Sequence, residues 1–570
     1  MFLALCVVPG CGEPEPFVSD TAVLWSPWDD DTLERADRAD RLVLLNLGTQ
    51  WCHWCHVMDE TTYAAPGVLA QIDAAYLPVR VDADSHPLLA ARYEDYGWPA
   101  TIVLAADGTE LAKLRGYVAP ERFESLLAAF ADDPTPGPSI VISPQPDWGD
   151  ATVLDDAVRE QMLARFAETW DEQHGGWGTV HKYLSADLIE WSIHAARRGD
   201  EVAEQRALVV LDAQRRWLHD PVWGGVYQYS DSGRWDSPHF EKLMAFQAAN
   251  LRVYAAADEQ WPGRGYGQAA VDIERYIDRF LTAPSGAFYA SQDADLVPGE
   301  HAGHYFALND GERMQQGVPR VDTAIYARDN GLAIEALARS SMHSGRSQPL
   351  TAAIEAAQAV LLTHQTATGG FSHRAGSETS LGDTVAMGRA LLTLYQATGD
   401  SRWLAQSERA AEYVDVHFRS PLGPGFVSAE STGPVSATMQ RDENIALARW
   451  ANLLWRTTEQ PEHQALAEAT RRYLFTPEIA LQYRVAVGGL LLVDYESKHT
   501  PVKVRIAGDG SGADALQAAA MRVPEWYKVV SREPDGEPVA WVCAQGVCSA
   551  PLAEPLAVRS VVDAMVKPTR

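Results

Sequence analysis

The stretch Trp51-Cys52-His53-Trp54-Cys55-His56 follows closely on the apolar run Leu42-Val-Leu-Leu-Asn-Leu47. The apolar run predicts a buried strand, and the two cysteines then fall at the start of the helix that follows it. Unpaired backbone N–H groups and the helix dipole at such a position favour a thiolate at Cys52. Cys55 lies one helical turn further on, where its thiol can attack a mixed disulfide formed at Cys52. The six residues therefore predict a site for thiol–disulfide exchange.

The segments that follow this site complete a small α/β fold. Residues 77–82 predict a second, parallel strand. Pro99 stands directly before a third strand, at the position where thioredoxin folds place a cis-proline that faces the cysteines. Asp107-Gly108 predicts a hairpin turn, and residues 120–130 predict a closing helix. We therefore expect a thioredoxin-like domain over residues 20–131.

Two other functions fit the same six residues. Cys52-His-Trp-Cys-His56 matches the attachment pattern of c-type haem, but haem attachment usually lies in a small helical domain and not after a buried strand. Two cysteines and two histidines also suit a metal site, yet four ligands on one helical turn cannot all converge on one ion. We expect a redox-active cysteine pair that needs no cofactor and no metal.

Two residues near the cysteines bear on their redox properties. His53 lies between them and, when protonated, stabilises a thiolate at Cys52. This stabilises the reduced form and makes the cysteine pair a stronger oxidant. Thioredoxins hold a buried aspartate six residues before the first cysteine, where it relays protons to the resolving cysteine; this chain has Asn46 there. Because an asparagine cannot take a proton, the sequence argues against a fast reductase. We expect catalytic roles for Cys52, Cys55 and His53, with Pro99 shaping the substrate groove.

The composition limits the class of protein and its partners. A chain of 570 residues with 46 % apolar residues is long enough for two or more domains. Its net charge of −30 is spread along the chain and argues against nucleic acid or anionic membrane surfaces as partners. No internal apolar run reaches the length of a membrane-spanning helix.

The first residues of the chain resemble the end of a lipoprotein signal. An apolar run, Phe2 to Val8, is followed by Pro9-Gly10-Cys11, although no basic segment precedes it and a proline is unusual there. We expect Cys11 to be lipidated and to tether a periplasm-facing protein of the cell envelope, with residues 1–19 as signal remnant and tether. A cytoplasmic location is the alternative. Export would allow disulfides at Cys52–Cys55 and at Cys543–Cys548.

Beyond a proline-rich linker at residues 132–149, the sequence acquires helical periodicity. Glycine-rich turns recur after about every second helix: Gly175-Gly-Trp, Gly224-Gly-Val-Tyr, Gly286-Ala-Phe-Tyr, Gly369-Gly-Phe, Gly423-Pro-Gly-Phe and Gly488-Gly-Leu. Six such turns indicate an internal repeat of helical hairpins. We expect residues 150–484 to close into an (α/α)6 toroid of the six-hairpin glycosidase type. Residues 485–570 then form a small C-terminal α/β segment, so the fold class is multidomain, α/β plus all-α.

The turns of this repeat also supply candidates for a ligand pocket. They are aromatic, basic and acidic residues that could bind a sugar in the funnel of a toroid: Trp177, Lys182, Tyr227, Trp235, His239, Glu241, Asp293, Asp295 and Asp383. Two carboxylates on separate loops suit glycoside chemistry, and a histidine suits proton abstraction in an epimerase. The same residues can instead cap helices and brace turns, so both functions stay open.

Several motifs of this chain are similar to those of the spermatogenesis-associated protein 20 family. They are Cys52-His-Trp-Cys-His-Val-Met58, Gly175-Gly-Trp-Gly178 with Lys182, Arg234-Trp-Asp-Ser-Pro-His-Phe-Glu-Lys242, Gly286-Ala-Phe-Tyr-Ala-Ser-Gln-Asp-Ala-Asp295 and the tail block around Cys543 and Cys548. The resemblance implies a thioredoxin-like domain fused to an all-helical toroid. Because the activity of that family is poorly defined, the resemblance implies an architecture and not a reaction.

Two functions follow as expectations. The first is a thiol–disulfide oxidoreductase that acts on a protein thiol or disulfide, with the toroid as a docking or ligand-binding surface. The second is a carbohydrate-active or sugar-binding toroid, epimerase-like or glycosidase-like, for which the thioredoxin-like domain is an accessory. In both, Cys543 and Cys548 are expected to pair or pack and not to catalyse.

Overall fold

A computed structural model describes residues 23–140, 146–430 and 436–566. Cys11 and the rest of the expected lipoprotein signal lie outside these residues. The chain divides into two compact units, residues 1–86 with 94–141 and residues 87–93 with 142–570. Within the described residues, no helix combines the length and the apolar character needed to span a bilayer.

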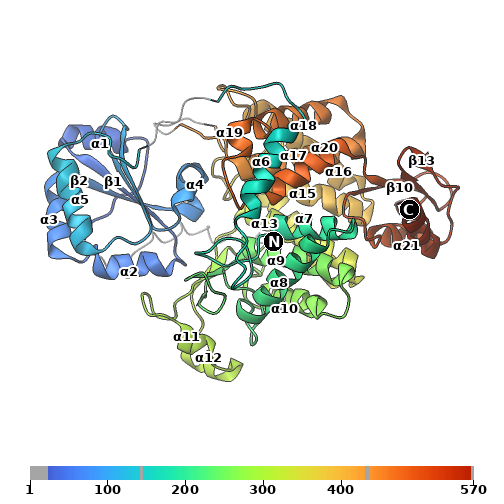
Figure 1. Cartoon of the computed structure of the whole chain (residues 1–570), viewed down its shortest axis with the longest axis horizontal. Helices are drawn as coiled ribbons and strands as arrows, with labels where there is room; N and C mark the ends of the chain where they lie inside the picture. The colour runs from blue at the N-terminus through green and yellow to red at the C-terminus, as the bar shows by residue number, and fades with distance from the viewer. Residues whose placement is uncertain (1–22, 141–145, 431–435, 567–570) are drawn as a thin grey trace, which may run out of the picture. The chain divides into compact units, whose positions relative to one another are not determined.

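The first unit is built on a four-stranded sheet with the order β2-β1-β3-β4 (Figure 1). β1 pairs in parallel with β2 and antiparallel with β3, and β4 pairs antiparallel with β3. This is the thioredoxin-like arrangement that the sequence predicts. The strands are β1 (Leu42–Gly48), β2 (Tyr76–Asp82), β3 (Ala100–Leu104) and β4 (Glu110–Arg115).

Helices connect and cover these strands. Every residue of β1 after Leu42 is buried, which explains why its sequence is a continuous apolar run. Tyr63, Tyr76 and Phe123 complete the core between the sheet and the helices. The elements around the sheet are α1 (Thr32–Ala39), α2 (His53–Thr61), α3 (Pro66–Ala75), η1 (Ala83–Ser85), η2 (Glu94–Tyr96) and α5 (Pro120–Asp132); α4 (Pro87–Tyr93) is grouped with the second unit.

The second unit contains a closed double ring of helices. Six inner helices contact one another in the cyclic order α7-α9-α13-α15-α17-α20, and α20 contacts α7 again. Gly331 allows the close contact of α13 with α15, since a Cβ there would lie 2.5 Å from the carbonyl carbon of Ala386. The inner helices are α7 (Ala186–Arg197), α9 (Met244–Gln260), α13 (Ala327–Ser344), α15 (Leu381–Thr398), α17 (Arg441–Thr458) and α20 (Gly488–Lys498).

An outer helix precedes each inner helix in the sequence, which makes the ring an (α/α)6 toroid. The outer helices are α6 (Asp156–Ala167), α8 (Glu201–Trp217), α10 (Tyr266–Phe280), α14 (Gln348–His364), α16 (Ser401–His417) and α18 (Pro461–Leu474). Arg159 of α6 forms an ion pair of 2.9 Å with Asp494 of α20 and so joins the first outer helix to the last inner one.

Short elements lie between the helices of the ring. They are β5 (Tyr229–Ser230), β6 (Pro238–His239), β7 (Lys242–Leu243), β8 (Ser291–Gln292), α11 (Gly303–Phe306), α12 (Asp310–Gln316), β9 (Val321–Asp322) and α19 (Pro477–Ala480). β5 pairs with β6, and β7, β8 and β9 form a three-stranded sheet just before α9 and α13 begin.

Each of the six inner helices contributes at least one charged side chain to the ion pairs inside the ring. Six of these residues, one from each helix, are Glu190, Arg252, Glu335, Arg389, Arg449 and Glu496. Arg449 lies 2.7 Å from Glu190 and 2.9 Å from Glu496, Arg252 lies 3.4 Å from Glu190, and Arg389 lies 3.2 Å from Glu335. We call this set the axial charge network. It lines the inside of the ring with paired charges.

The C-terminal module follows the ring and packs on α15 and α17. Its sheet has the order β11-β10-β12-β13 (Figure 1, red). Asn452 of α17 donates a hydrogen bond of 2.7 Å to Tyr527 of this module, and Trp526 donates one of 2.7 Å to His194 of α7. Its elements are β10 (Val502–Ala507), α21 (Gly510–Met521), β11 (Lys528–Glu533), β12 (Val539–Ala544), β13 (Val547–Cys548) and α22 (Pro555–Val566).

The end of the toroid differs from the boundary expected from the sequence. The toroid was expected to end at residue 484, but its last inner helix is α20, Gly488–Lys498. Gly488-Gly489 begins this helix and is not a turn like the five others. A Cβ at Gly488 would lie 2.5 Å from the backbone nitrogen of Leu188, so the glycine serves the close contact of α20 with α7.

Candidate functional site

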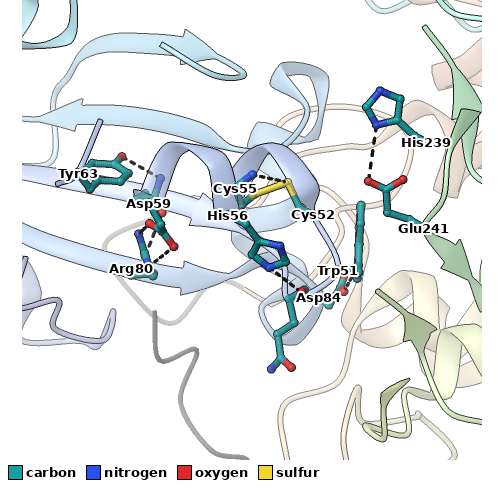
Figure 2. The surroundings of a disulfide bond; sticks show 12 residues. Trp51, Cys52, Cys55, His56, Asp59, Tyr63, Arg80, Asp84, His239 and Glu241 are labelled. Carbon is teal, nitrogen blue, oxygen red and sulfur yellow. Dashed lines mark hydrogen bonds and ion pairs between the residues drawn. A yellow bond between two sulfur atoms is a disulfide. The ribbon is translucent and has the colours of Figure 1, made fainter. Parts of the chain in front are cut away.

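The two cysteines lie where β1 leads into α2, and they form a disulfide bond (Figure 2). Cys52 is the N-cap of α2, and its sulfur accepts a hydrogen bond of 3.1 Å from the backbone N–H of Cys55. A donor in this position stabilises negative charge on the Cys52 sulfur once the disulfide is reduced. The predicted disulfide between Cys543 and Cys548 is also present.

Gly48 and Pro99 border the cysteines from the sheet. The peptide bond Trp98–Pro99 is cis, as the sequence predicts. Pro99 directly precedes β3, whose first residue, Ala100, pairs with Leu47 of β1, so Pro99 lies at the end of β1 that leads to Cys52. A Cβ placed on Gly48 would lie 3.2 Å from the sulfur of Cys55. A side chain at this position would therefore press on the disulfide.

A buried ion pair lies beneath the cysteine helix. Arg80 of β2 pairs with both carboxylate oxygens of Asp59 (Figure 2). The Nε atom of Arg80 donates a hydrogen bond of 3.1 Å to Asn46. Asp59 follows Cys55 by four residues, and both belong to the buried face of α2. The ring of Trp25 covers the guanidinium group of Arg80 at 4.3 Å.

This ion pair changes the expectation drawn from Asn46. The side chain of Asn46 donates a hydrogen bond of 3.0 Å to the hydroxyl of Tyr63, and burial raises the pKa of Tyr63 to about 12. The strand position that holds an acid in thioredoxins is thus neutral here. The buried acid lies instead on the helix, as Asp59, and is paired with Arg80. The domain therefore retains a charged group beneath its resolving cysteine.

The remaining polar residues of the motif are held by local contacts. The indole N–H of Trp51 donates a hydrogen bond of 2.6 Å to Asp84, and Nε2 of His56 lies 3.1 Å from the backbone oxygen of Gln50. The ring of His53 lies edge-on to Trp54, with 5.5 Å between the ring centroids, and Trp54 is 38 % exposed. An exposed aromatic side chain between the cysteines can contact a protein substrate.

Four of the toroid candidates are locked into the scaffold. Lys182 is fully buried and donates to Asp171 at 2.8 Å, while Asp171 accepts hydrogen bonds from the backbone N–H groups of Gln173 and His174. Trp235 donates to the backbone oxygen of His174 at 3.2 Å. Trp177 stacks on Phe166, and Tyr227 contacts Phe240 and Phe306. These contacts brace the glycine turns.

The same brace occurs in the next turn. Asp220 accepts hydrogen bonds from the N–H groups of Val222 and Trp223 and binds Lys242 at 2.7 Å. Arg313 of α12 binds the same carboxylate at 2.7 Å, so this turn also holds the α11–α12 segment. Both turns share the pattern Asp-x-x-x-Gly-Gly, at Asp171 and at Asp220. This pattern is the sequence signal that could have revealed the two aspartates.

His239 and Glu241 come together just before α9. Nδ1 of His239 lies 3.8 Å from Glu241, and its Nε2 lies 3.4 Å from Asp231. Burial opposes a charge on His239, but the carboxylates of Glu241 and Asp231 outweigh it and raise the pKa of the imidazole. The ring of Tyr229 stacks on His239 with 4.3 Å between the centroids.

Three side-chain oxygens in this part of the toroid are buried and form no hydrogen bond within the described residues: Glu241 Oε2, Ser291 Oγ and Asp322 Oδ2. The register of the small sheet pairs Leu243 with Ser291 and Ser291 with Asp322, so Ser291 and Asp322 lie on neighbouring strands, and Glu241 directly precedes the third strand, β7. Groups of this kind can bind the hydroxyls of a ligand.

The other acidic candidates have internal partners. Asp293 accepts a hydrogen bond of 3.0 Å from the N–H of Asp295, and Asp295 accepts one of 2.9 Å from the N–H of Gly299. Asp383 is buried and pairs with His373 at 2.9 Å; burial opposes its charge, but His373 and the hydrogen bonds lower the pKa of this carboxyl. Sequence reasoning missed His373, because nothing in its spacing links it to α15.

The fold and the site together define the class of protein. A redox-type cysteine pair at the start of α2, beside a cis-proline, defines a thioredoxin-like domain, and it is joined to an (α/α)6 toroid. The first of these assignments agrees with a family model. Residues 17–130 match the family Thioredox_DsbH, described as a protein of unknown function, DUF255.

The resemblance to the spermatogenesis-associated protein 20 family is confirmed. The chain is 24 % identical to spermatogenesis-associated protein 20 of Mus musculus over 323 residues, which cover 50 % of this chain and 41 % of the mouse protein. It is 29 % identical to the Homo sapiens protein over 147 residues, covering 25 % of this chain and 19 % of that protein. The chain thus spans less than half the length of these relatives.

Solved structures similar to the chain include two sugar-converting enzymes. Cellobiose 2-epimerase from Bacillus thermoamylovorans B4167 is 11 % identical, with 56 % of this chain and 86 % of the enzyme covered at a TM-score of 0.45. A D-mannose isomerase is 12 % identical, with 60 % and 96 % covered at a TM-score of 0.47.

Proposed function

We propose that this protein is a thiol–disulfide oxidoreductase that acts through Cys52 and Cys55 on protein thiols or disulfides. The observation that carries the proposal is the N-cap position of Cys52, whose sulfur accepts the backbone N–H of Cys55. This arrangement stabilises the Cys52 thiolate, which is the attacking group. The exposed ring of Trp54 between the cysteines provides an apolar contact for a protein substrate.

The exchange proceeds in two balanced steps. In the reducing direction, the Cys52 thiolate attacks a substrate disulfide, and one substrate sulfur leaves as a thiolate and takes up a proton. The Cys55 thiol then loses its proton and attacks the sulfur of Cys52, so that the second substrate sulfur leaves. The substrate gains two electrons and two protons, and the pair is left as a disulfide. The reverse sequence oxidises a substrate dithiol.

The redox state of the Cys52–Cys55 peptide, followed by thiol alkylation and mass spectrometry across a glutathione series, tests this proposal. We expect a reversible transition and a turnover of a protein disulfide such as that of insulin. Cys55→Ser should accumulate a mixed disulfide at Cys52, whereas Cys52→Ser should accumulate none. Cysteines that stay in one state across the whole series would rule the proposal out.

A second candidate function rests on the toroid. His239, flanked by Glu241 and Asp231 beside the buried acceptors Ser291 and Asp322, could bind a small carbohydrate and act as a base in epimerase-like chemistry. In that case the thioredoxin-like domain is an accessory. The proposed tether at Cys11 would place either activity at the cell envelope.

Proton exchange on sugars distinguishes this second function. A panel of mono- and disaccharides incubated with the protein in D2O should show deuterium incorporation at one ring carbon by NMR. His239→Gln should abolish the incorporation, while the matched variant His499→Gln, at an exposed histidine, should retain it. No incorporation with any sugar of the panel would leave the oxidoreductase as the one supported function.

A further inference from the structure

The C-terminal module repeats the strand order and the strand directions of the first domain. In both sheets the first and second strands are parallel, the third is antiparallel to the first, and the fourth is antiparallel to the third. The order β11-β10-β12-β13 is therefore the same as β2-β1-β3-β4. The two parallel strands are connected by helices, α2 and α3 in the first domain and α21 alone in the module, and in both cases another helix follows the last strand.

The correspondence extends to the residues around the first helix. Pro538 directly precedes β12, as Pro99 precedes β3. Pro538 also lies against the start of α21, since a Cβ on Gly512 would lie 3.1 Å from the Cβ of Pro538. The segment that would carry a cysteine pair reads Gly508-Asp-Gly-Ser-Gly512, so the helix start has no thiol.

The cysteines of this module lie on the hairpin instead. Cys543 of β12 and Cys548 of β13 form a disulfide, and β13 is the edge strand of the sheet. Cys548 is exposed and Cys543 is half-buried. A thiolate from another protein group can therefore approach the sulfur of Cys548 from solvent.

A cationic residue, Lys503, lies opposite Cys543 on the neighbouring strand. Lys503 of β10 pairs directly with Cys543, and Cys543 pairs with Cys548, so the three side chains form one row on one face of the sheet. The ammonium group of Lys503 also pairs with Glu459 at 2.6 Å. When Cys548 is attacked, Cys543 leaves as a thiolate, and a neighbouring ammonium group favours that leaving group.

The disulfide is not needed to close its hairpin. Gln545 and Gly546 have φ values of 51° and 80°, which suit a two-residue hairpin turn, and Ser549 donates to Val542 at 2.8 Å. A crosslink across so short a loop removes little entropy from the unfolded chain. Its exposed position at an edge therefore points to chemical use.

We propose that the C-terminal module is a second thioredoxin-like module and that its Cys543–Cys548 disulfide exchanges with a thioredoxin-type dithiol. The proposal rests on the oxidoreductase function above and names a substrate for it: the dithiol is Cys52–Cys55, either of the same chain or of a second copy. This substrate is a site within the protein itself.

The transfer is balanced without any further reactant. The Cys52 thiolate attacks Cys548, and Cys543 leaves as a thiolate that takes up a proton. Cys55 loses its proton and attacks Cys52, which releases Cys548 as the second thiol. Two electrons and two protons thus pass to Cys543 and Cys548, and Cys52–Cys55 becomes the disulfide.

A transfer assay between two full-length variants tests the exchange. The donor carries Cys543→Ser and Cys548→Ser and is reduced beforehand; the acceptor carries Cys52→Ser and Cys55→Ser and is oxidised. After mixing, alkylation and mass spectrometry report the state of each peptide. We expect Cys543–Cys548 to be reduced while Cys52–Cys55 is oxidised, several-fold faster than with reduced glutathione at the same thiol concentration.

Two further measurements identify the source of the dithiol and the attacked sulfur. In the oxidised Cys55→Ser protein, treated with a limiting amount of reductant, we expect a linked peptide that joins Cys52 to Cys548. Reduced wild-type protein is given one equivalent of oxidant, and the movement of the disulfide between the two cysteine pairs is followed over time. A rate constant that does not depend on the protein concentration indicates exchange within one chain. A rate constant that rises in proportion to the protein concentration indicates exchange between two copies. Lys503→Met should slow the transfer more than Arg505→Met, which changes the next row of the same face.

The outcomes separate this inference from the function on which it rests. If Cys52–Cys55 cycles with insulin and glutathione but Cys543–Cys548 stays oxidised, or is reduced no faster than by glutathione, the inference is wrong and the function stands. If Cys52–Cys55 does not cycle at all, the proposed function fails first. Far-UV circular dichroism of each variant confirms that the exchange is measured on folded protein.

Discussion

The backbone of Gly48 lies directly against the sulfur of Cys55, so that a Cβ at this position would come within 3.2 Å of it. Gly48 is the last residue of β1, and its backbone does not require a glycine for conformational reasons. The glycine is thus needed for space beside the disulfide. This relationship leads to the first of four predictions.

Gly48→Ala should favour the reduced form of the pair. In the disulfide, Cys55 is fixed and cannot turn away from the added methyl group, whereas the free thiol can change its rotamer. We expect the oxidised form to lose about 1–3 kcal/mol of stability relative to the reduced form, as in other overpacked sites. The glutathione equilibrium of the Cys52–Cys55 peptide measures this directly. Gly149→Ala, at a glycine where an added Cβ would make only an ordinary contact of 3.9 Å with the backbone nitrogen of Ala151, should leave the equilibrium unchanged.

Asp59→Asn and Arg80→Met should have opposite effects on Cys55. Asp59→Asn leaves an unbalanced cation beneath the cysteine and should lower the pH at which the Cys55 thiol ionises by about one unit or more. Arg80→Met leaves an unbalanced carboxylate and should raise it. The reduction potential is measured between pH 5 and 10. Its slope against pH changes at the pH where the Cys55 thiol ionises, so the position of this change measures the effect of each variant.

The double variant is the control for this pair. The double variant Asp59→Asn, Arg80→Met lacks both charges. The pH at which its reduction potential changes slope should therefore be close to that of the wild type. A general loosening of the domain would instead move both single variants in the same direction. Tyr63, whose ring also contacts Arg80, is unchanged in all variants and provides a common background.

Asp220→Asn should destabilise the toroid strongly. It leaves Lys242 and Arg313 buried without their shared carboxylate, and both side chains are fully buried. Removing one partner from such a group costs about 3–5 kcal/mol. Chemical denaturation followed by circular dichroism measures the loss. Glu533→Gln, in an exposed pair with Arg505, should cost less than about 1 kcal/mol.

Acidification should weaken the attachment of the C-terminal module through His194. Burial, with help from Arg198 and Arg197, lowers the pKa of His194 to about 4, while the unfolded chain has the ordinary value near 6.5. The unfolded state therefore binds the proton more tightly. The neutral form of His194 therefore contributes fully to the free energy of unfolding above about pH 6.5. This contribution is lost as the pH falls toward 4, and at pH 5 the loss is about 2 kcal/mol.

The unfolding free energy at pH 7 and pH 5 tests this effect. His194→Gln can still accept the hydrogen bond of Trp526 but cannot be protonated, so its loss of stability between the two pH values should be smaller than that of the wild type. Equal losses in the two proteins would show that other groups account for the acid sensitivity. His304→Gln, at an exposed histidine that does not contribute to the pKa of His194, is the matched control.

The first domain could be predicted well because its signals are local. The apolar run of β1, the cysteine spacing and Pro99 each mark one element, and their order along the chain fixes the sheet. The ion pair of Asp59 and Arg80 could not be deduced in the same way, since it joins two elements across the core. A charged residue within the apolar strand Leu77 to Val81 was nevertheless a signal that Arg80 needs a buried partner.

The sequence repeat predicted the toroid, but it did not show which of the candidate residues form a pocket. The glycine-rich turns revealed the number of hairpins, yet the same turns place Lys182 and Trp235 in bracing roles and His239 in a cluster with Glu241. Residue type and spacing do not distinguish these roles, because the distinction depends on what lies opposite each side chain. The end of the toroid was placed too early, at residue 484, because Gly488 begins the last inner helix and is not part of a turn.

The axial charge network also implies an order in which the ring can form while the chain is being synthesised. Arg449 binds Glu190, a residue 259 positions earlier in the chain, and also binds Glu496 of α20, the last inner helix. A ribosome makes about 5–20 residues per second, so Glu190 waits many seconds for its pair with Arg449, although its pair with Arg252 can form earlier. A nascent or truncated chain cannot settle into the finished ring. Closure of the ring is therefore a late step, which requires the last inner helix to have been synthesised.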